Sequence, residues 1–295
     1  MPVIHEFRIP LPLSVDEFHR GQLYMTAKAE LEAAVASGKE GVVVLKNEPY
    51  DNTDGHLGNC PITGTIIPLD KGQYTLKHYV FASKVPTVLK AIAPASALYL
   101  IEYAWNGFPH CKTVLVSGYL SKETLKIDVE TMHIANDMNL NNAVGLSNTE
   151  LLNRKVEFID IRSSVKPDSP DYLSELDSSI FKSKKTLRGE LKAGWMEDAQ
   201  NKALRNEEGV APFMTCYKVV RAHCSLFGLS STVENAILGQ QRGLFSSTHN
   251  KAFVTIDEWI DATMDDIRKL EAETAEKVVA LLGDNVKVDT TLKKK

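Results

Sequence analysis

The chain has 295 residues, with 34 Lys and Arg against 38 Asp and Glu, so its formal net charge is −4. Hydrophobic residues make up 43% and charged residues 24%, values typical of soluble globular domains, which argues against collagen-like, disordered and disulfide-rich scaffolds. A weakly acidic chain also lacks the broad basic field that attracts nucleic acid or anionic membranes over long distances. We therefore expect no nucleic-acid partner, and any contact with phosphate or lipid must come from a local group of residues.

The cysteines and the N-terminus indicate a cytoplasmic protein. The four cysteines form no C-x-x-C pair and have no histidine at metal-binding spacing, which is typical of thiols kept reduced in the cytosol. The N-terminus carries an early acid and lacks a signal peptide's apolar core. The longest apolar stretch, residues 91–101, is far shorter than the ~20 residues that cross a bilayer. Contact with a membrane is therefore expected to be peripheral and transient, and no metal site is expected.

Hydrophobic periodicity predicts many strands and few helices in the first half of the chain. Residues 3–9 alternate as a strand, and Ser14 with Glu17 forms a capping box before a helix that ends near Gly38. Further strands are predicted at residues 41–45, 73–81, 97–106, 113–120, 125–133 and 156–161, with room for one short helix at 84–93. Strands at this spacing, mostly without intervening helices, favour an antiparallel meander.

The second half begins with a change in composition. Residues 162–194 are rich in Ser, Pro, Asp and Lys, which predicts a long polar surface loop with a helical turn or two. A strand is predicted at 215–224. Ser231 and Glu234 have the spacing of a second capping box, opening a helix that runs toward residue 247.

The C-terminal region is predicted as a lid. One long helix is expected over residues 253–282, so that the lid helix and its polar tail together span 253–295. No linker or repeat divides the chain, which predicts a single domain over residues 1–295. Its fold class is α+β, with one antiparallel sheet covered on one face by an early helix and two late helices.

Five polar side chains lie where periodicity calls for a hydrophobic residue: Gln22, Asn106, Thr131, Lys218 and Glu271. Each alone has an ordinary explanation, because a lone amide or hydroxyl is usually a satisfied core group and a lone lysine usually extends to solvent. Together they suggest a polar pocket in an apolar interior, since burying an isolated charge is costly. Such a pocket suits an amphiphile with a charged, hydroxyl-rich end.

Catalytic patterns are missing from the sequence. It contains no G-x-S-x-G elbow, phosphate-binding glycine loop, dinucleotide fingerprint or H-E-x-x-H motif. His110 and Cys111 are neighbours, so on a strand they would point to opposite faces and could not act as a base and nucleophile. We therefore predict no catalytic residue and no cofactor, and an enzyme is the less favoured hypothesis.

Several blocks of sequence resemble the class I phosphatidylinositol transfer proteins. In chain order they are residues 21–24, 45–50, 71–77, 83–86, 104–106, 109–113, 228–229 with 234–235, and 259–268. They occur in the family's order, so the resemblance covers nearly the whole chain. It implies a START-like helix-grip fold, in which a curved antiparallel sheet holds one phospholipid in a cavity against long helices.

The resemblance also implies the residues that would contact this lipid. The inositol ring would be held by Thr75, Lys77, Asn106 and Glu271. The phosphate would contact Gln22, Thr113, Thr131 and Lys218, and Cys111 would line the headgroup region. Thr75 and Lys77 are predicted from the resemblance alone, because a Thr/Lys strand face by itself is typical of a solvated sheet surface.

Three departures from the family pattern stand out. The loop from Asp51 to Asp70 is longer than usual. The family's exposed aromatic docking pair appears as Leu226-Phe227, which together with Leu229 we predict as the membrane-docking residues. The strand near Thr131 carries one extra residue, and a shift of one position would turn Thr131 to the other face.

The resemblance implies a monomeric, cytoplasmic carrier that exchanges phosphatidylinositol or phosphatidylcholine, its bound cargo, between membranes. An alternative is a sensor or adaptor that transfers no lipid and presents inositol lipid to a lipid kinase. A START-like enzyme or cyclase acting on a small molecule would need a catalytic base in the cavity, and of the five polar residues above only Glu271 could serve. Ser163 and Ser164 could be phosphorylated to gate opening, although ordinary loop serines are more common.

Overall fold

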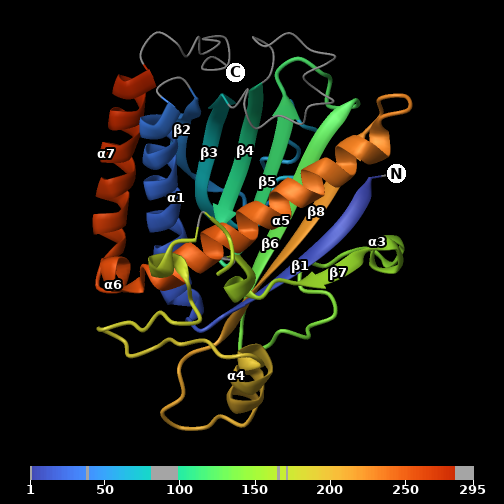
Figure 1. Cartoon of the computed structure of the whole chain (residues 1–295). Helices are drawn as coiled ribbons and strands as arrows, with labels where there is room; N and C mark the ends of the chain where they lie inside the picture. The colour runs from blue at the N-terminus through green and yellow to red at the C-terminus, as the bar shows by residue number, and fades with distance from the viewer. Residues whose placement is uncertain (1, 38–39, 81–98, 165–166, 171, 283–295) are drawn as a thin grey trace.

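A computed structural model of the chain describes residues 2–37, 40–80, 99–164, 167–170 and 172–282. Eight strands form one curved sheet in the order β2-β3-β4-β5-β6-β8-β1-β7, and Figure 1 shows that the sheet does not close on itself. Helix α5 runs diagonally across one face, while α1 and α7 lie beside the β2 edge. This arrangement confirms the predicted α+β class and is consistent with a START-like fold. We call the face covered by α5 the concave face and the opposite face the convex face.

The strands are β1 (Val3–Leu11), β2 (Gly41–Asp51), β3 (Lys71–Val80), β4 (Tyr99–Gly107), β5 (His110–Ser117), β6 (Leu125–Ala135), β7 (Lys155–Phe158) and β8 (Met214–Cys224). Each predicted strand is present, with ends moved by up to several residues. The largest change is in β2, which pairs with β3 along its whole length and so continues to Asp51. Pairing partners, which periodicity does not report, decide where a strand ends.

The predicted meander is wrong at the last short strand. β2 to β6 and then β8 and β1 pair antiparallel, but β7 lies at the sheet edge parallel to β1. The chain crosses from β6 over the convex side before it reaches β7, and this long connection allows the parallel direction. The first strand of the chain therefore lies inside the sheet, between β8 and β7.

Helix α1 (Val15–Ser37) begins with the predicted capping box. The Ser14 hydroxyl accepts from the Glu17 amide at 3.1 Å, and the Glu17 carboxylate accepts from the Ser14 amide at 2.8 Å. One turn later Gly21 packs directly on the buried Trp259 ring, where an added Cβ would come within 2.8 Å of the indole. This close approach fixes α1 against the C-terminal helices.

The second predicted capping box does not form. Helix α5 (Ser230–Val254) has no side-chain cap, and the buried Glu234 carboxylate instead accepts from the Cys224 amide at the end of β8, at 3.0 Å. An unsatisfied buried amide costs more free energy than an uncapped helix end that is exposed to water. The Glu234 carboxylate therefore accepts from the Cys224 amide and does not cap the helix. Glu234 thus joins α5 to β8.

The single C-terminal helix predicted over 253–282 is divided. α5 ends at Val254, α6 (Ile256–Trp259) is one turn, and α7 (Met264–Leu282) starts anew. Asp257 accepts from the Ser183 hydroxyl at 2.5 Å and the Lys184 amide at 2.8 Å, which ties α6 to the polar loop.

Four shorter helical features complete the described chain. The loop 162–194 carries the single turns η2 (Ile161–Ser164) and η3 (Ser174–Leu176), as predicted. Helices α3 (Asn148–Asn153) and α4 (Trp195–Leu204) had not been predicted, although Ser147 and Glu150 form a complete capping box before α3. The expected helix at 84–93 and the tail after 282 lie outside the described residues.

Apolar residues form a separate core on each face of the sheet. On the concave face, β1, β6 and β8 pack against α5 through residues such as Phe7, Val129 and Phe245. On the convex face, Leu76, Trp105 and other residues of β3 to β5 pack under the connection between β2 and β3. Polar side chains on the concave face are therefore surrounded by apolar neighbours.

Candidate functional site

The strand register brings the predicted sheet residues to the concave face in adjacent rows. One row runs across the strands through Gln73, Asn106, Cys111, Thr131 and Lys218. The next row runs through Thr75, Ala104, Thr113, Val129 and Val220. Thr131 keeps the face shared with Lys218, so the extra residue suspected in this strand does not turn it away. Seven predicted residues from five strands therefore face the same side, since Lys77 shares the face of Thr75.

The Lys218 ammonium is the central charge of this face. It donates to the Thr131 hydroxyl at 3.3 Å and lies 5.2 Å from the centre of the Phe245 ring. Burial lowers the pKa of Lys218, and the thiols of Cys216 and Cys111 partly oppose this lowering. No carboxylate is among the groups that influence this pKa. Within the described residues, no acid lies at ion-pair distance from this amine.

Two buried histidines lie next to Lys218, and neither of them can compensate its charge. His133 holds its Nδ1 at 2.8 Å from the Pro109 carbonyl, and His249 holds its Nδ1 at 2.7 Å from the Phe245 carbonyl. Burial and the Lys218 charge lower the pKa of His133 to about 3 and keep the pKa of His249 well below its ordinary value. Both rings are therefore neutral near pH 7, and the ammonium remains uncompensated.

The other end of the concave face has paired charges. The Lys77 ammonium donates to the Glu30 carboxylate of α1 at 2.7 Å, and it faces Glu102 across the β3–β4 pair. Burial alone would lower the pKa of Lys77, but Glu30 and Glu102 outweigh it and raise it. The Tyr79 hydroxyl donates to Glu102 at 2.8 Å. This cluster has ammonium donors and carboxylate acceptors, which a polyhydroxylated ring can bind.

Glu30 and Glu102 were missed from the sequence. Glu30 lies two turns after Gln22 on α1, so helical spacing could have placed it on the same face. Glu102 gives no such signal, because its importance follows from its register opposite Lys77.

The remaining predicted headgroup residues come from different elements. Asn106 donates from its amide to the Gln73 carbonyl at 3.3 Å, and Gln22 is half-buried on α1 beside Gly21. Glu271, on α7, accepts from Arg268 at 2.6 Å and is close enough to Lys77 to help raise the pKa of that amine. α1 and α7 thus bring polar groups toward the part of the sheet that carries Lys77.

The three predicted docking residues differ in exposure. They lie in the connection between β8 and α5, coloured orange in Figure 1. Phe227 is completely exposed, whereas Leu226 and Leu229 are half-buried and pack on the concave core. Gly228 has φ of +72°, which turns the chain tightly between them. Phe227 is therefore the side chain that extends freely.

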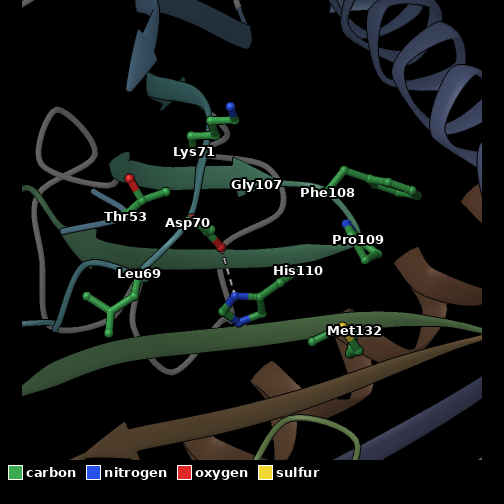
Figure 2. Close-up of a pocket in the computed structure, with 9 residues that line it drawn as sticks. All are labelled: Thr53, Leu69, Asp70, Lys71, Gly107, Phe108, Pro109, His110 and Met132. Carbon is green, nitrogen blue, oxygen red and sulfur yellow. Dashed lines mark hydrogen bonds and ion pairs between the residues drawn. The ribbon is translucent and has the colours of Figure 1, made fainter. Parts of the chain in front are cut away.

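A cavity of about 700 Å³ opens at the opposite end of the sheet (Figure 2). It lies where the β4–β5 turn meets the end of the loop 51–70, and His110 and Met132 on its wall belong to the convex face. The His110 ring bridges Asp70 at 3.1 Å and Glu130 at 3.3 Å, and the hydrogen bond that the ring donates to Glu130 is the main cause that raises the pKa of His110. None of the predicted headgroup residues lines this cavity, so it is not the predicted headgroup site.

Two other kinds of site are not found among the described residues. These residues contain no cluster of three or more His, Cys, Asp or Glu side chains placed to hold a metal ion. Among the helices described, none combines the length and apolar character that a membrane span requires. Ser163 is exposed in η2 and Ser164 is half-buried there, so the phosphorylation hypothesis stays a prediction.

Comparison with known proteins identifies relatives along nearly the whole chain. The family model for phosphatidylinositol transfer protein matches residues 2–276. The chain is 38% identical over 274 residues to the phosphatidylinositol transfer protein beta isoform of Rattus norvegicus, covering 93% of this chain and 92% of that protein. It is 38% identical over 285 residues to phosphatidylinositol transfer protein 2 of Dictyostelium discoideum, covering 96% and 98%. Identity to cytoplasmic phosphatidylinositol transfer protein 1 of Drosophila melanogaster is 34% over 282 residues, covering 94% and 92%.

Proposed function

Because this chain belongs to the phosphatidylinositol transfer protein family, we propose that it carries one phosphatidylinositol or phosphatidylcholine molecule on its concave face and exchanges it between membranes. The observation that carries this proposal is the half-buried Lys218 ammonium, which lies beside the Thr131 hydroxyl without a carboxylate partner among the described residues. A charge that is largely removed from water is stabilised by a counter-ion. The lipid phosphodiester would supply one, and its oxygens would also accept from Thr131, Gln22 and Thr113.

The inositol ring would lie toward the paired charges. Its hydroxyls can donate to Glu271 and accept from Lys77, while the side chains of Thr75 and Asn106 can do both. Choline offers no hydroxyl donors, so these groups would lose partners with phosphatidylcholine. The same site can therefore hold both lipids through their common phosphate and favour phosphatidylinositol through its ring.

Transfer needs no covalent chemistry. A two-chain phospholipid has about 30 methylenes, and at ~0.8 kcal/mol each, their exposure to water would cost on the order of 25 kcal/mol. A carrier replaces this exposure with its own apolar surface. In this account Phe227 inserts at the membrane, α7 loosens as a lid, and one lipid replaces another; the protein acts as a cytoplasmic monomer that touches membranes transiently.

An inter-vesicle transfer assay with the purified chain tests the proposal. We expect catalytic amounts of protein to move labelled phosphatidylinositol, and more slowly phosphatidylcholine, from donor to acceptor vesicles. Stoichiometric binding without transfer would instead support the sensor or adaptor that serves a lipid kinase. Binding of neither lipid would reject the proposed function.

A further inference from the structure

The connection between β2 and β3 forms a hairpin on the convex face. Asn59 bridges to Ile66, the Cys60 amide donates to the Thr65 carbonyl at 2.8 Å, and the Ile67 amide donates to the Gly58 carbonyl at 3.0 Å. Buried Cys60 and Ile67 anchor it to the convex core. Residues 61–64 are its tip, and we call them the hairpin tip.

Two lysines of the β5–β6 hairpin hold this tip at one end of the sheet. The Lys122 ammonium donates to the Ile62 carbonyl at 2.9 Å. The Lys126 ammonium donates to the Thr63 carbonyl at 3.2 Å and to the Thr65 hydroxyl at 3.1 Å. The hairpin tip is therefore fixed beside the turn that joins β5 to β6.

The β5–β6 turn is itself hydrogen-bonded to the connection that carries Phe227. The Ser225 amide donates to the Thr124 carbonyl at 2.9 Å, and the Ser225 hydroxyl donates to the Glu123 carbonyl at 3.0 Å. Three turns, residues 61–64, 118–124 and 225–229, consequently form one continuous edge, which we call the docking edge.

Each turn of the docking edge exposes one large apolar or aromatic side chain. Ile62 is 38% exposed, Tyr119 55% and Phe227 completely. The only charged residues in these three turns are Lys122 and Glu123, so the edge has no net charge. Separate apolar and aromatic side chains on a neutral rim suit the interface of a bilayer, where aromatic rings are favoured and a basic surface is unnecessary.

We propose that the hairpin tip is a second membrane-contact element, through which Ile62 enters the bilayer interface together with Tyr119 and Phe227. The inference rests on the proposed lipid-carrier function, because the occupant of the docking edge is the membrane that Phe227 meets. The long connection 51–70 thereby acquires a role, because it carries an apolar side chain across the convex face to the edge where lipid would be exchanged.

The test measures binding of the full chain to phosphatidylcholine vesicles that contain phosphatidylinositol. Ile62→Asp should weaken binding roughly tenfold and Phe227→Asp at least as much, because an aspartate replaces an apolar side chain at the interface. The Ile62 carbonyl remains available to Lys122, so the hairpin should stay in place. The matched control is Leu69→Asp: Leu69 is more exposed, lies in the same connection and lines the cavity at the opposite end of the sheet, and should have no effect.

The outcomes separate this inference from the proposed function. Weaker binding of Ile62→Asp with unchanged binding of Leu69→Asp and unchanged thermal melting supports the hairpin tip as a membrane contact. Unchanged binding of Ile62→Asp while Phe227→Asp binds weakly overturns the inference and leaves the carrier intact. Equal losses for Ile62→Asp and Leu69→Asp also overturn it. Absence of any transfer by the wild-type chain rejects the proposed function itself.

Discussion

Lys218 and Arg221 lie three residues apart on β8 and point to opposite faces of the sheet, where their charges have different partners. Arg221 points to the convex face, where it donates to Glu150 at 2.7 Å, Glu130 at 2.9 Å and Asp128 at 3.1 Å. Lys112 joins the same carboxylates of β6 from β5. Lys218 points to the concave face, where its partners among the described residues are a hydroxyl, thiols and aromatic rings.

The difference distinguishes a structural charge from a binding charge. A cation surrounded by acids is satisfied by the fold and has no need of a ligand. A half-buried cation without an acid has lost part of its hydration in the lipid-free protein and gains most when an anion binds. On this argument the convex network stabilises the fold, whereas Lys218 stabilises the complex.

The largest expected effect is that of Lys218→Met. Removing the ammonium while keeping most of the side-chain volume should lower transfer of phosphatidylinositol and phosphatidylcholine about a hundredfold, because the buried phosphate loses its counter-ion. The lipid-free protein should be at least as stable as wild type in chemical denaturation, since a half-buried charge without an acidic partner has been removed. Normal transfer by this variant would show that Lys218 does not bind the phosphate.

Arg221→Met should lower the stability of the protein and leave lipid transfer unchanged, the opposite of Lys218→Met. It leaves three carboxylates without this partner, so the free energy of unfolding should fall by about 2–4 kcal/mol. Transfer per folded molecule, measured well below the melting temperature, should stay near the wild-type value. Loss of transfer without loss of stability would contradict the division between the two faces.

Smaller, lipid-selective effects are expected at the other end of the concave face. Thr75→Ala and Glu271→Ala should each lower phosphatidylinositol transfer roughly five- to tenfold and phosphatidylcholine transfer less, because only inositol offers hydroxyls to these groups. The measurement is the ratio of the two rates in one assay. Equal losses for both lipids would reject the assignment of these residues to the inositol ring.

A last prediction concerns the pH dependence of stability. Burial alone would raise the pKa of Glu130, but hydrogen bonds and ion pairs with His110, Lys112 and Arg221 lower it to about 2 from 4.5. The folded protein thus holds this proton less tightly than the unfolded chain, and the stabilisation present above pH 4.5 is lost as the pH falls toward 2. Glu130→Gln should flatten this part of the stability profile, measured by urea unfolding at stepped pH; an unchanged slope would contradict it.

Much of the concave face could be predicted because the strand period is two. Thr131 and Lys218 stand among apolar residues on their own strands, so their orientation is visible in the sequence alone. Glu102 could not be found in this way, because its contact with Lys77 depends on the pairing register of β3 and β4, which the pattern within one strand does not report. The family resemblance supplied Thr75 and Lys77, which alternation alone would have assigned to solvent.

Errors in the predicted fold arose where a distant partner outweighed a local motif. Glu234 has capping-box spacing but bonds the Cys224 amide. The β7 strand alternates normally, yet its parallel pairing with β1 depends on the path of the chain across the convex side. The hairpin 58–67 has a weak strand pattern and is held by lysines some 60 residues later in the chain.

Native mass spectrometry of the purified chain tests the central claim most directly. The account predicts that the wild-type protein retains one phosphatidylinositol or phosphatidylcholine molecule, identified after extraction, that Arg221→Met retains it as well, and that Lys218→Met is empty. A wild-type protein without phospholipid, or a Lys218→Met protein with the same occupancy, would contradict the claim that the unpaired ammonium of the concave face holds a lipid phosphate.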